Sequence, residues 1–64
     1  MKAFVCLTDI TGQPVAVSVN NITKMTVGAQ INPGTVSSVI WFVDGTHVGI
    51  KLPLVDLLVV MNGT

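Results

Sequence analysis

The chain has 64 residues, of which half are hydrophobic and only 9% are charged, and its formal net charge is zero. This length allows one domain with a small core, because a chain of about 60 residues buries only about 60% of its extended surface on folding. One cysteine excludes an internal disulfide, and one histidine excludes a Cys/His zinc site within one chain. Three lysines and three aspartates give little protection against association. We therefore expect oligomerisation to support the small core.

The high hydropathy raises the question of a membrane protein, which the residue pattern disfavours. A spanning helix needs about 20 consecutive apolar residues. The longest apolar run, residues 52–61, is far shorter and contains Asp56. The N-terminal run is too short for the apolar core of a signal peptide. We expect no membrane contact, and a soluble protein of the cytoplasm, where a single free cysteine stays reduced.

The composition favours strands, and turn residues divide the chain into segments of strand length. Twelve valines, five isoleucines and seven threonines give a bias toward β-branched residues. The positions of these turn residues predict five antiparallel strands, at residues 2–8, 14–19, 22–28, 36–43 and 46–52. Residues 28–34 are predicted to form a loop, because this segment ends in the strong turn sequence Asn-Pro-Gly.

The pair Asp44-Gly45 lies between two apolar runs and is a strong hairpin signal. A two-residue turn would pair Ile40 with Gly49, whose missing side chain would leave open space beside Ile40. Ile40 and Phe42 would then lie on a second, partly apolar face. The core face would carry Val39, Trp41, Val43, Val48 and Ile50. A three-residue turn would shift this pairing and could reverse the faces of one strand.

Residues 53–62 are predicted to form a short C-terminal helix, because Pro53 suits its first turn and an Asn-Gly pair suits its end. A sixth strand is the alternative, since valine has only middling helix propensity. Helical spacing directs Leu54, Leu57, Leu58 and Met61 toward the sheet, and leaves Val55, Val59 and Val60 outside with Asp56. A helix that is apolar all round is normally buried, so its outer side calls for a partner.

These elements predict a mainly β (α+β) domain spanning residues 1–64, built as a twisted sheet or small open barrel with a short C-terminal helix. The predicted hairpin and the predicted helix each carry an apolar face that the small core does not bury. Such faces usually mark interaction sites. We predict an interface formed by Ile40, Phe42, Val55, Val59 and Val60. It would contact another copy of the chain or a dedicated protein partner. The expected role is a non-catalytic, oligomeric binding or regulatory module.

The residues that could support chemistry have simpler structural explanations. Asp9 and Asp44 fall in turns, where aspartate bonds to the backbone, and Asp56 falls in the first helical turn, where the helix dipole favours a negative charge. Cys6 and His47 could form a nucleophile–base pair, but no motif supports one. We therefore predict no catalytic, cofactor-binding or metal-binding residues, and a protein that is not an enzyme.

Nucleic acid is the alternative ligand. Small β-barrels often bind it through basic grooves and exposed aromatic residues. Three lysines balanced by three aspartates make a poor electrostatic footprint. An oligomer could nevertheless align Lys24 or Lys51 into a basic stripe, and strong retention on heparin at low salt would favour this function.

The order of motifs along the chain resembles that of the FlbD-like flagellar and swarming motility proteins. The segments FVCLTDITGQPVAVSVNNITKM and VIWFVDGTHVGIKLPLVDLL carry the resemblance. The matching positions are Leu7, Thr8, Gly12, Pro14, Val15, Val17, Ile22, Met25, Gly45, Val48, Ile50, Lys51, Val55 and Leu58. The strand–strand–helix rhythm is also similar to LytTR DNA-binding domains, at about half their length. The FlbD-like resemblance implies a small non-enzymatic regulatory or accessory protein, with no catalytic residues to carry over.

Overall fold

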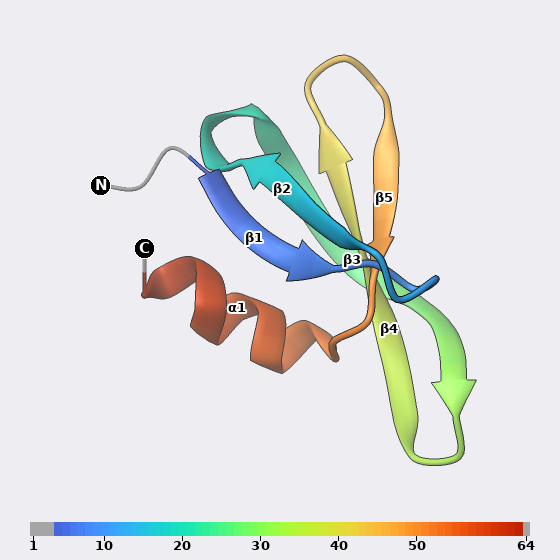
Figure 1. The fold of residues 1–64 in the computed structure, drawn as a ribbon. Coiled ribbons are helices and arrows are strands. Elements are labelled where there is room, and N and C mark those ends of the chain that lie inside the picture. Colours follow the sequence, from blue (N-terminus) through green and yellow to red (C-terminus); the bar gives the residue numbers. More distant parts are fainter. Residues whose placement is uncertain (1–3, 64) are drawn as a thin grey trace.

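The computed structural model describes residues 4–63, which form two antiparallel sheets and one helix (Figure 1). The first sheet pairs β1 (Phe4–Thr8) with β2 (Pro14–Ser18), and a 3₁₀ turn, η1 (Val19–Asn21), leads out of it. The second sheet has the order β3 (Ile22–Asn32), β4 (Thr35–Phe42) and β5 (His47–Ile50). The helix α1 (Leu54–Asn62) follows. The predicted mainly β class with a C-terminal helix is confirmed.

The third strand departs most from the prediction. Residues 28–32 were predicted to be a loop, but β3 continues through them to Asn32. Register shifts on either side of Gln30 let the strand stay paired with β4 despite the irregular sequence. Gly28 fits this segment because a Cβ atom there would lie 2.6 Å from the Ser37 hydroxyl. The predicted start of the first strand, at Lys2, lies outside the described residues.

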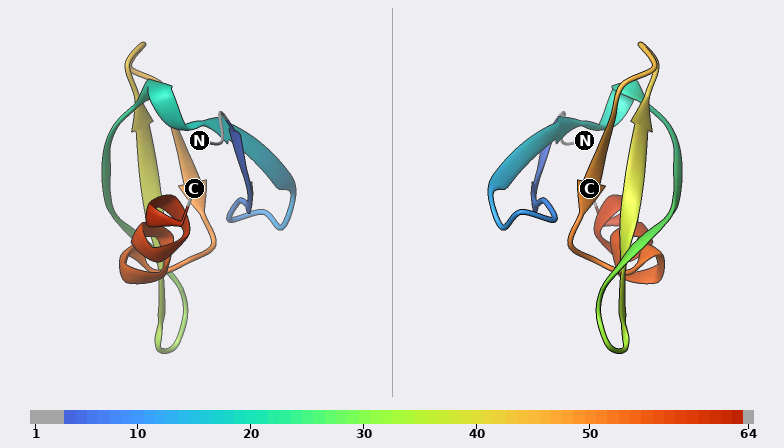
Figure 2. Two further views of the ribbon diagram at one scale, coloured as in Figure 1. Left: turned by 90° about the vertical axis from the view of Figure 1, so that its left-hand side faces the viewer. Right: turned by 90° about the vertical axis from the view of Figure 1, so that its right-hand side faces the viewer.

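The two sheets are joined at one corner, where the chain after β1 runs beside β5. The Lys51 amide donates to the Thr8 carbonyl at 2.9 Å, and the Ile10 amide donates to the Gly49 carbonyl at 3.2 Å. Beyond this corner the β1–β2 hairpin diverges from the second sheet, as both views in Figure 2 show. The five strands therefore form two separate antiparallel sheets, β1-β2 and β3-β4-β5, which an isolated bridge between Asp9 and Ile50 links at this corner.

The β4–β5 hairpin has a three-residue turn, so the predicted two-residue register is wrong. The Phe42 amide donates to the Thr46 carbonyl at 2.9 Å, and Gly45 adopts a φ of +91° within the turn. Asp44 Oδ1 accepts hydrogen bonds from both the amide and the hydroxyl of Thr46, which fixes the turn. Ile40 consequently opposes Val48 instead of Gly49.

This one-residue shift reverses the predicted faces of β4. Ile40 is fully buried in the core, whereas Val43, predicted to be core, is 65% exposed. Trp41 lies half-buried on the outer face of the sheet. The space at Gly49 is filled by the protein's own Ile10, whose side chain would lie 3.2 Å from an added Cβ atom.

The core lies between the two sheets and is closed by α1. It consists of Val5 and Leu7 of β1, Val17 of β2, Ile40 of β4, Ile50 of β5 and Leu57 of α1. Leu57 is completely buried and is the buried residue of the helix. The two buried serines donate to backbone carbonyls, Ser37 to Ala29 at 2.6 Å and Ser38 to Leu52 at 2.7 Å. Both hydroxyls therefore avoid the cost of an unpaired buried polar group.

Candidate functional site

The outer face of α1 carries the largest apolar side chains that the helix leaves exposed. Val55 is 66% exposed, Leu58 is 42% exposed and Val59 is 68% exposed. Their spacing of three and four residues places them on one face of the helix. We call these three residues the helix ridge. In Figure 2 (left), α1 stands in front of the β3-β4-β5 sheet, which leaves this outer side of the helix uncovered.

The structure brings only part of the predicted interface to the surface. Val55 and Val59 lie on the helix ridge. Ile40 is fully buried inside the protein, and Phe42 and Val60 are partly buried against the core. Ile40 and Phe42 were placed on the surface by the wrong hairpin register, and Val60 turns inward beside Leu57. Leu58, which was predicted to face the sheet, replaces Val60 on the outer face.

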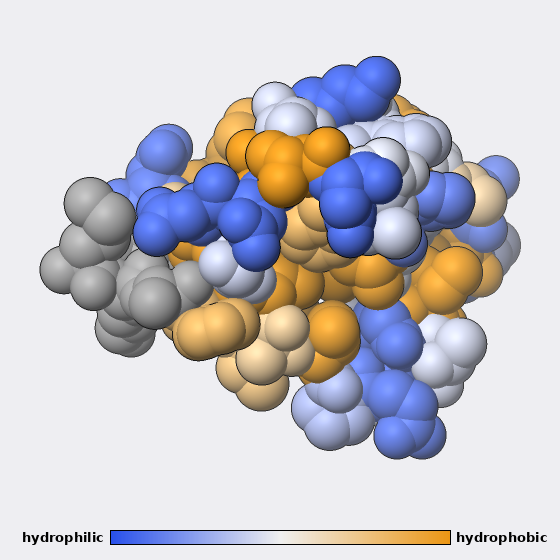
Figure 3. Space-filling view, turned by 90° about the horizontal axis from the view of Figure 1, so that it is seen from above, coloured by the Kyte–Doolittle hydropathy of each residue, from blue (hydrophilic) through white to orange (hydrophobic). Residues whose placement is uncertain are grey.

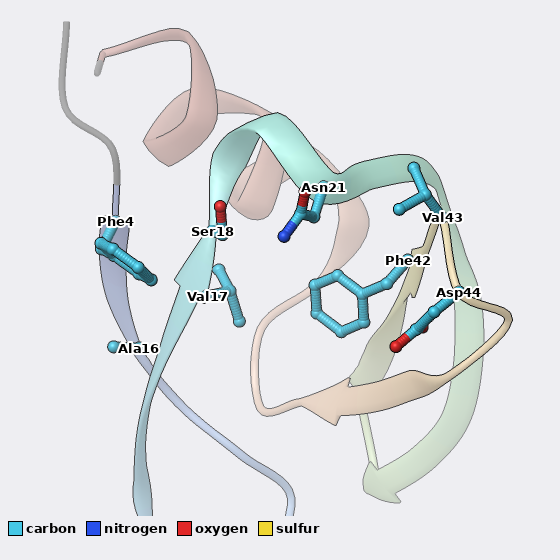
Figure 4. A pocket seen from close by; sticks show the side chains of 8 residues that line it. All are labelled: Phe4, Ala16, Val17, Ser18, Asn21, Phe42, Val43 and Asp44. Carbon is cyan, nitrogen blue, oxygen red and sulfur yellow. The ribbon is translucent and has the colours of Figure 1, made fainter.

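A hollow of about 440 Å³ lies at the outer edge of β2, and we call it the β2-edge hollow. Figure 3 looks down on this end of the molecule, where hydrophilic and apolar residues lie side by side at the surface. Figure 4 shows Phe42 and Val17 facing one another across the hollow, with Asn21 above and Asp44 beyond the Phe42 ring. Its lining residues are Phe4, Ala16, Val17, Ser18, Asn21, Phe42, Val43 and Asp44.

The outer face of the second sheet carries a stack of three side chains centred on Trp41. The Lys24 ammonium lies 5.0 Å from the centre of the Trp41 ring, and the His47 ring centre lies 4.6 Å away at a tilt of 33°. The indole N–H donates to Thr26 Oγ1 at 3.0 Å. A cation within about 6 Å of a tryptophan ring is attracted by its π electrons. The neighbouring Lys24 and His47 leave less of the ring open for stacking with a nucleic-acid base.

The structure does not bring the two candidate nucleic-acid lysines to the same place. Lys24 is paired with Trp41 near the turn end of β4, whereas Lys51 follows the Ser38–Ile50 pair. Trp41 and Ser38 are three residues apart on β4, so the two lysines are separated by at least about 10 Å along the sheet. Lys51 also anchors the corner between the sheets through its backbone amide. A continuous basic stripe would have to be built from several copies.

Asp9 and Asp44 each stabilise a hairpin turn with their ionised carboxylates. The Thr11 hydroxyl and the Gln13 amide lower the pKa of Asp9 below its usual value of 3.8. The hydroxyl and amide of Thr46 lower the pKa of Asp44 in the same way. Hydrogen bonds from these donors favour the charged form of each carboxyl group. Both residues therefore have the structural role that the turn sequences predicted.

The lowered pKa values of these two aspartates predict a loss of stability in acid. A carboxyl group whose pKa is lower in the folded state stabilises the protein above its unfolded pKa, and this contribution disappears as the pH falls through the folded pKa. The urea midpoint of the native chain should therefore fall below about pH 4. In a variant with Asp9→Asn and Asp44→Asn the midpoint should fall less over the same range. Equal acid sensitivity of the two proteins would contradict the turn assignment.

The two residues considered as a nucleophile–base pair lie on different sheets. Cys6 is exposed on β1, and His47 begins β5 and stacks against Trp41. Over the described part of the chain, no three histidine, cysteine or acidic side chains gather as a group that could hold a metal ion. Among residues 4–63, no helix has the length and apolar character needed to cross a membrane.

Comparisons of the chain with protein-family models, with curated proteins and with solved structures found no match. Sequence reasoning identified two members of the helix ridge and missed Leu58, although its three-residue spacing from Val55 was a usable signal. It also missed the β2-edge hollow, which is assembled from residues far apart in the sequence.

Proposed function

We propose that this protein is a non-catalytic binding or regulatory module that acts through protein–protein contacts and associates with itself through the helix ridge. The observation that carries the proposal is the exposure of Val55, Leu58 and Val59 on one face of α1. Exposed apolar side chains that gather on one face usually mark an interaction site. The FlbD-like resemblance, which implies a small regulatory or accessory protein, agrees with this role.

The size of the helix ridge supports a second copy as its partner, in a weak complex. Burying one large apolar side chain is worth about 1.5–3 kcal/mol, and the ridge side chains are already partly covered. Six such side chains, three from each copy, would therefore contribute about 6–10 kcal/mol across a twofold axis. This is comparable with the roughly 4–15 kcal/mol that association costs in lost freedom. The expected assembly dissociates on dilution.

The net charge of zero supports self-association, because two copies do not repel one another strongly. The helix ridge has one charged neighbour on the helix, Asp56, which lies in the first turn. Nucleic-acid binding has less support, since Lys24 and His47 flank the Trp41 ring and Lys51 lies apart from them. Retention on heparin at low salt would restore that alternative.

Dilution followed by NMR tests the proposed surface directly. If copies meet through the helix ridge, the amide signals of residues 55–60 should shift as the protein is diluted. The signals of Asp44 and Gly45, in the turn at the far end of the second sheet, should stay in place and serve as the internal control. Shifts confined to the turn, or no shifts at any concentration, would contradict self-association through α1.

A further inference from the structure

The β2-edge hollow lies against a strand whose outer side is unpaired. Within the described chain, β2 pairs only with β1, and Ala16, Val17 and Ser18 line the hollow. An unpaired strand edge is a template for the backbone of another extended chain. The direction of its free N–H and C=O groups therefore decides what the hollow can hold.

The hydrogen bonds of the first hairpin indicate where these groups point. In an antiparallel pair, bonded residue pairs alternate with non-bonded pairs. The Asp9 amide donates to the Gln13 carbonyl at 2.9 Å, which makes this a bonded pair. Counting along the ladder, Val17 belongs to a bonded pair and Ala16 to a non-bonded pair. The N–H and C=O of Ala16 consequently point away from β1.

The opposite side of the same hairpin supports this alternation. Thr8 belongs to a non-bonded pair with Pro14, so its carbonyl should also point away from its partner strand. It does so, and accepts a hydrogen bond from the Lys51 amide at 2.9 Å. Pro14 has no amide hydrogen to offer, which is typical of an edge strand.

The side chains around the edge suit an extended strand with apolar side chains on both of its faces. Ala16 and Val17 point to opposite sides of β2 in Figure 4. Phe4 lies with Ala16 on one side, and Phe42 lies with Val17 on the other. Successive side chains of an extended peptide also point to opposite faces. A peptide laid along β2 would thus place one apolar side chain against each aromatic ring.

The charge around the hollow selects among such peptides. Among the described residues that line it, Asp44 carries the only charge. Hydrogen bonds from Thr46 lower the pKa of this carboxyl group, so it remains ionised at neutral pH. A carboxylate at the rim favours a basic residue two positions from the apolar residue that faces Phe42, on the same face of the peptide.

We propose that the β2-edge hollow binds an extended peptide segment that adds to β2 as a further strand, with apolar side chains on Phe42 and Phe4 and a lysine or arginine beside Asp44. This site is separate from the helix ridge and does not depend on self-association. It gives the module a second surface, specific for an extended polypeptide strand in which two adjacent apolar residues are followed by a basic one.

The test titrates the isotope-labelled full chain with a capped hexapeptide that contains the run Ile-Phe-Lys, in which isoleucine and lysine point to the face of Phe42 and Asp44 and phenylalanine points to the face of Phe4. We expect the amide signals of Ala16, Ser18 and Asp44 to shift, and the Ala16 amide to become protected from hydrogen exchange. A matched peptide with glutamate in place of lysine should bind more weakly, because it places like charges beside Asp44.

Two variants separate backbone pairing from nonspecific adhesion. Ala16→Pro removes the outward N–H without removing a β1–β2 hydrogen bond, and should weaken binding about fivefold or more. Asp44→Asn keeps an acceptor for Thr46 but removes the charge, and should weaken binding about two- to fivefold. Asp9→Asn is the matched control, since Asp9 occupies the other hairpin turn and is not among the residues that line the hollow.

Several outcomes would overturn the proposal. One is the absence of shifts at millimolar peptide, and another is a set of shifts that maps to the helix ridge. Binding that Ala16→Pro leaves unchanged, in a variant whose spectrum shows the native fold, would exclude strand addition. Without peptide, the Ala16 amide could already be protected from hydrogen exchange to a degree that rises with protein concentration. A second copy would then occupy the β2 edge, and the proposal of a separate peptide partner would be refuted. If Ala16→Pro does not fold, equal binding by the Asp44→Asn and Asp9→Asn variants would still refute the charge selection.

Discussion

Replacing Leu57 by alanine should destabilise this protein more than any other single truncation in α1. Leu57 is fully buried and is the helix residue that completes the core between the two sheets. Truncation of a buried leucine costs about 2–5 kcal/mol, and a core this small supplies only about 3–5 kcal/mol of net stability. Urea unfolding followed by Trp41 fluorescence should show a large fraction of unfolded chain without denaturant.

The neighbouring Leu58 provides a matched control for this prediction. It carries the same side chain in the same helix, but is 42% exposed. Leu58→Ala should lower the free energy of unfolding by less than about 1 kcal/mol when urea unfolding is measured at high dilution, where association does not contribute. Equal costs at the two positions would mean that α1 does not close the core in the way described.

Replacing Val59 by lysine should abolish self-association while leaving the fold intact. Val59 is 68% exposed and is the C-terminal member of the helix ridge, so a charge there would lose its hydration at the contact between copies. In the isolated protein the lysine remains in water, in the second half of α1, where the helix dipole favours a positive charge. The particle mass should fall to that of one chain, 6.7 kDa, with an unchanged circular dichroism spectrum.

Val43→Lys is the control for the added charge. Val43 is 65% exposed, almost as much as Val59, but lies in the β4–β5 turn at the other end of the sheet. The Val43→Lys variant should associate like the native chain. If both variants dissociate, the net charge and not the helix ridge governs assembly. If neither does, the interface lies elsewhere.

The class of the fold could be predicted from the sequence because local signals are strong and independent of tertiary contacts. Pro53 and the terminal Asn-Gly pair marked α1, and β-branched residues marked the strands. Residues 28–32 were wrongly predicted to be a loop, because glycine and asparagine are turn signals when only the local sequence is considered. Pairing with β4, which no local pattern encodes, kept them in β3.

The hairpin register could not be predicted, because residues 39–43 are apolar on both faces. Register is specified when one face is apolar and the other polar, and this strand lacks that contrast. Asp44-Gly45 is compatible with two- and three-residue turns, and both would place Gly45 at positive φ. The wrong register led to the prediction that Ile40 and Phe42 lie on the surface. Helical spacing correctly predicted that Val55 and Val59 are exposed.

Light scattering behind a sizing column, over a concentration series of the native chain, tests self-association most directly. We expect a mass that rises with concentration from 6.7 kDa to a discrete multiple of that value. A mass that stays at 6.7 kDa up to millimolar concentration, with the protein folded, would contradict self-association through the helix ridge.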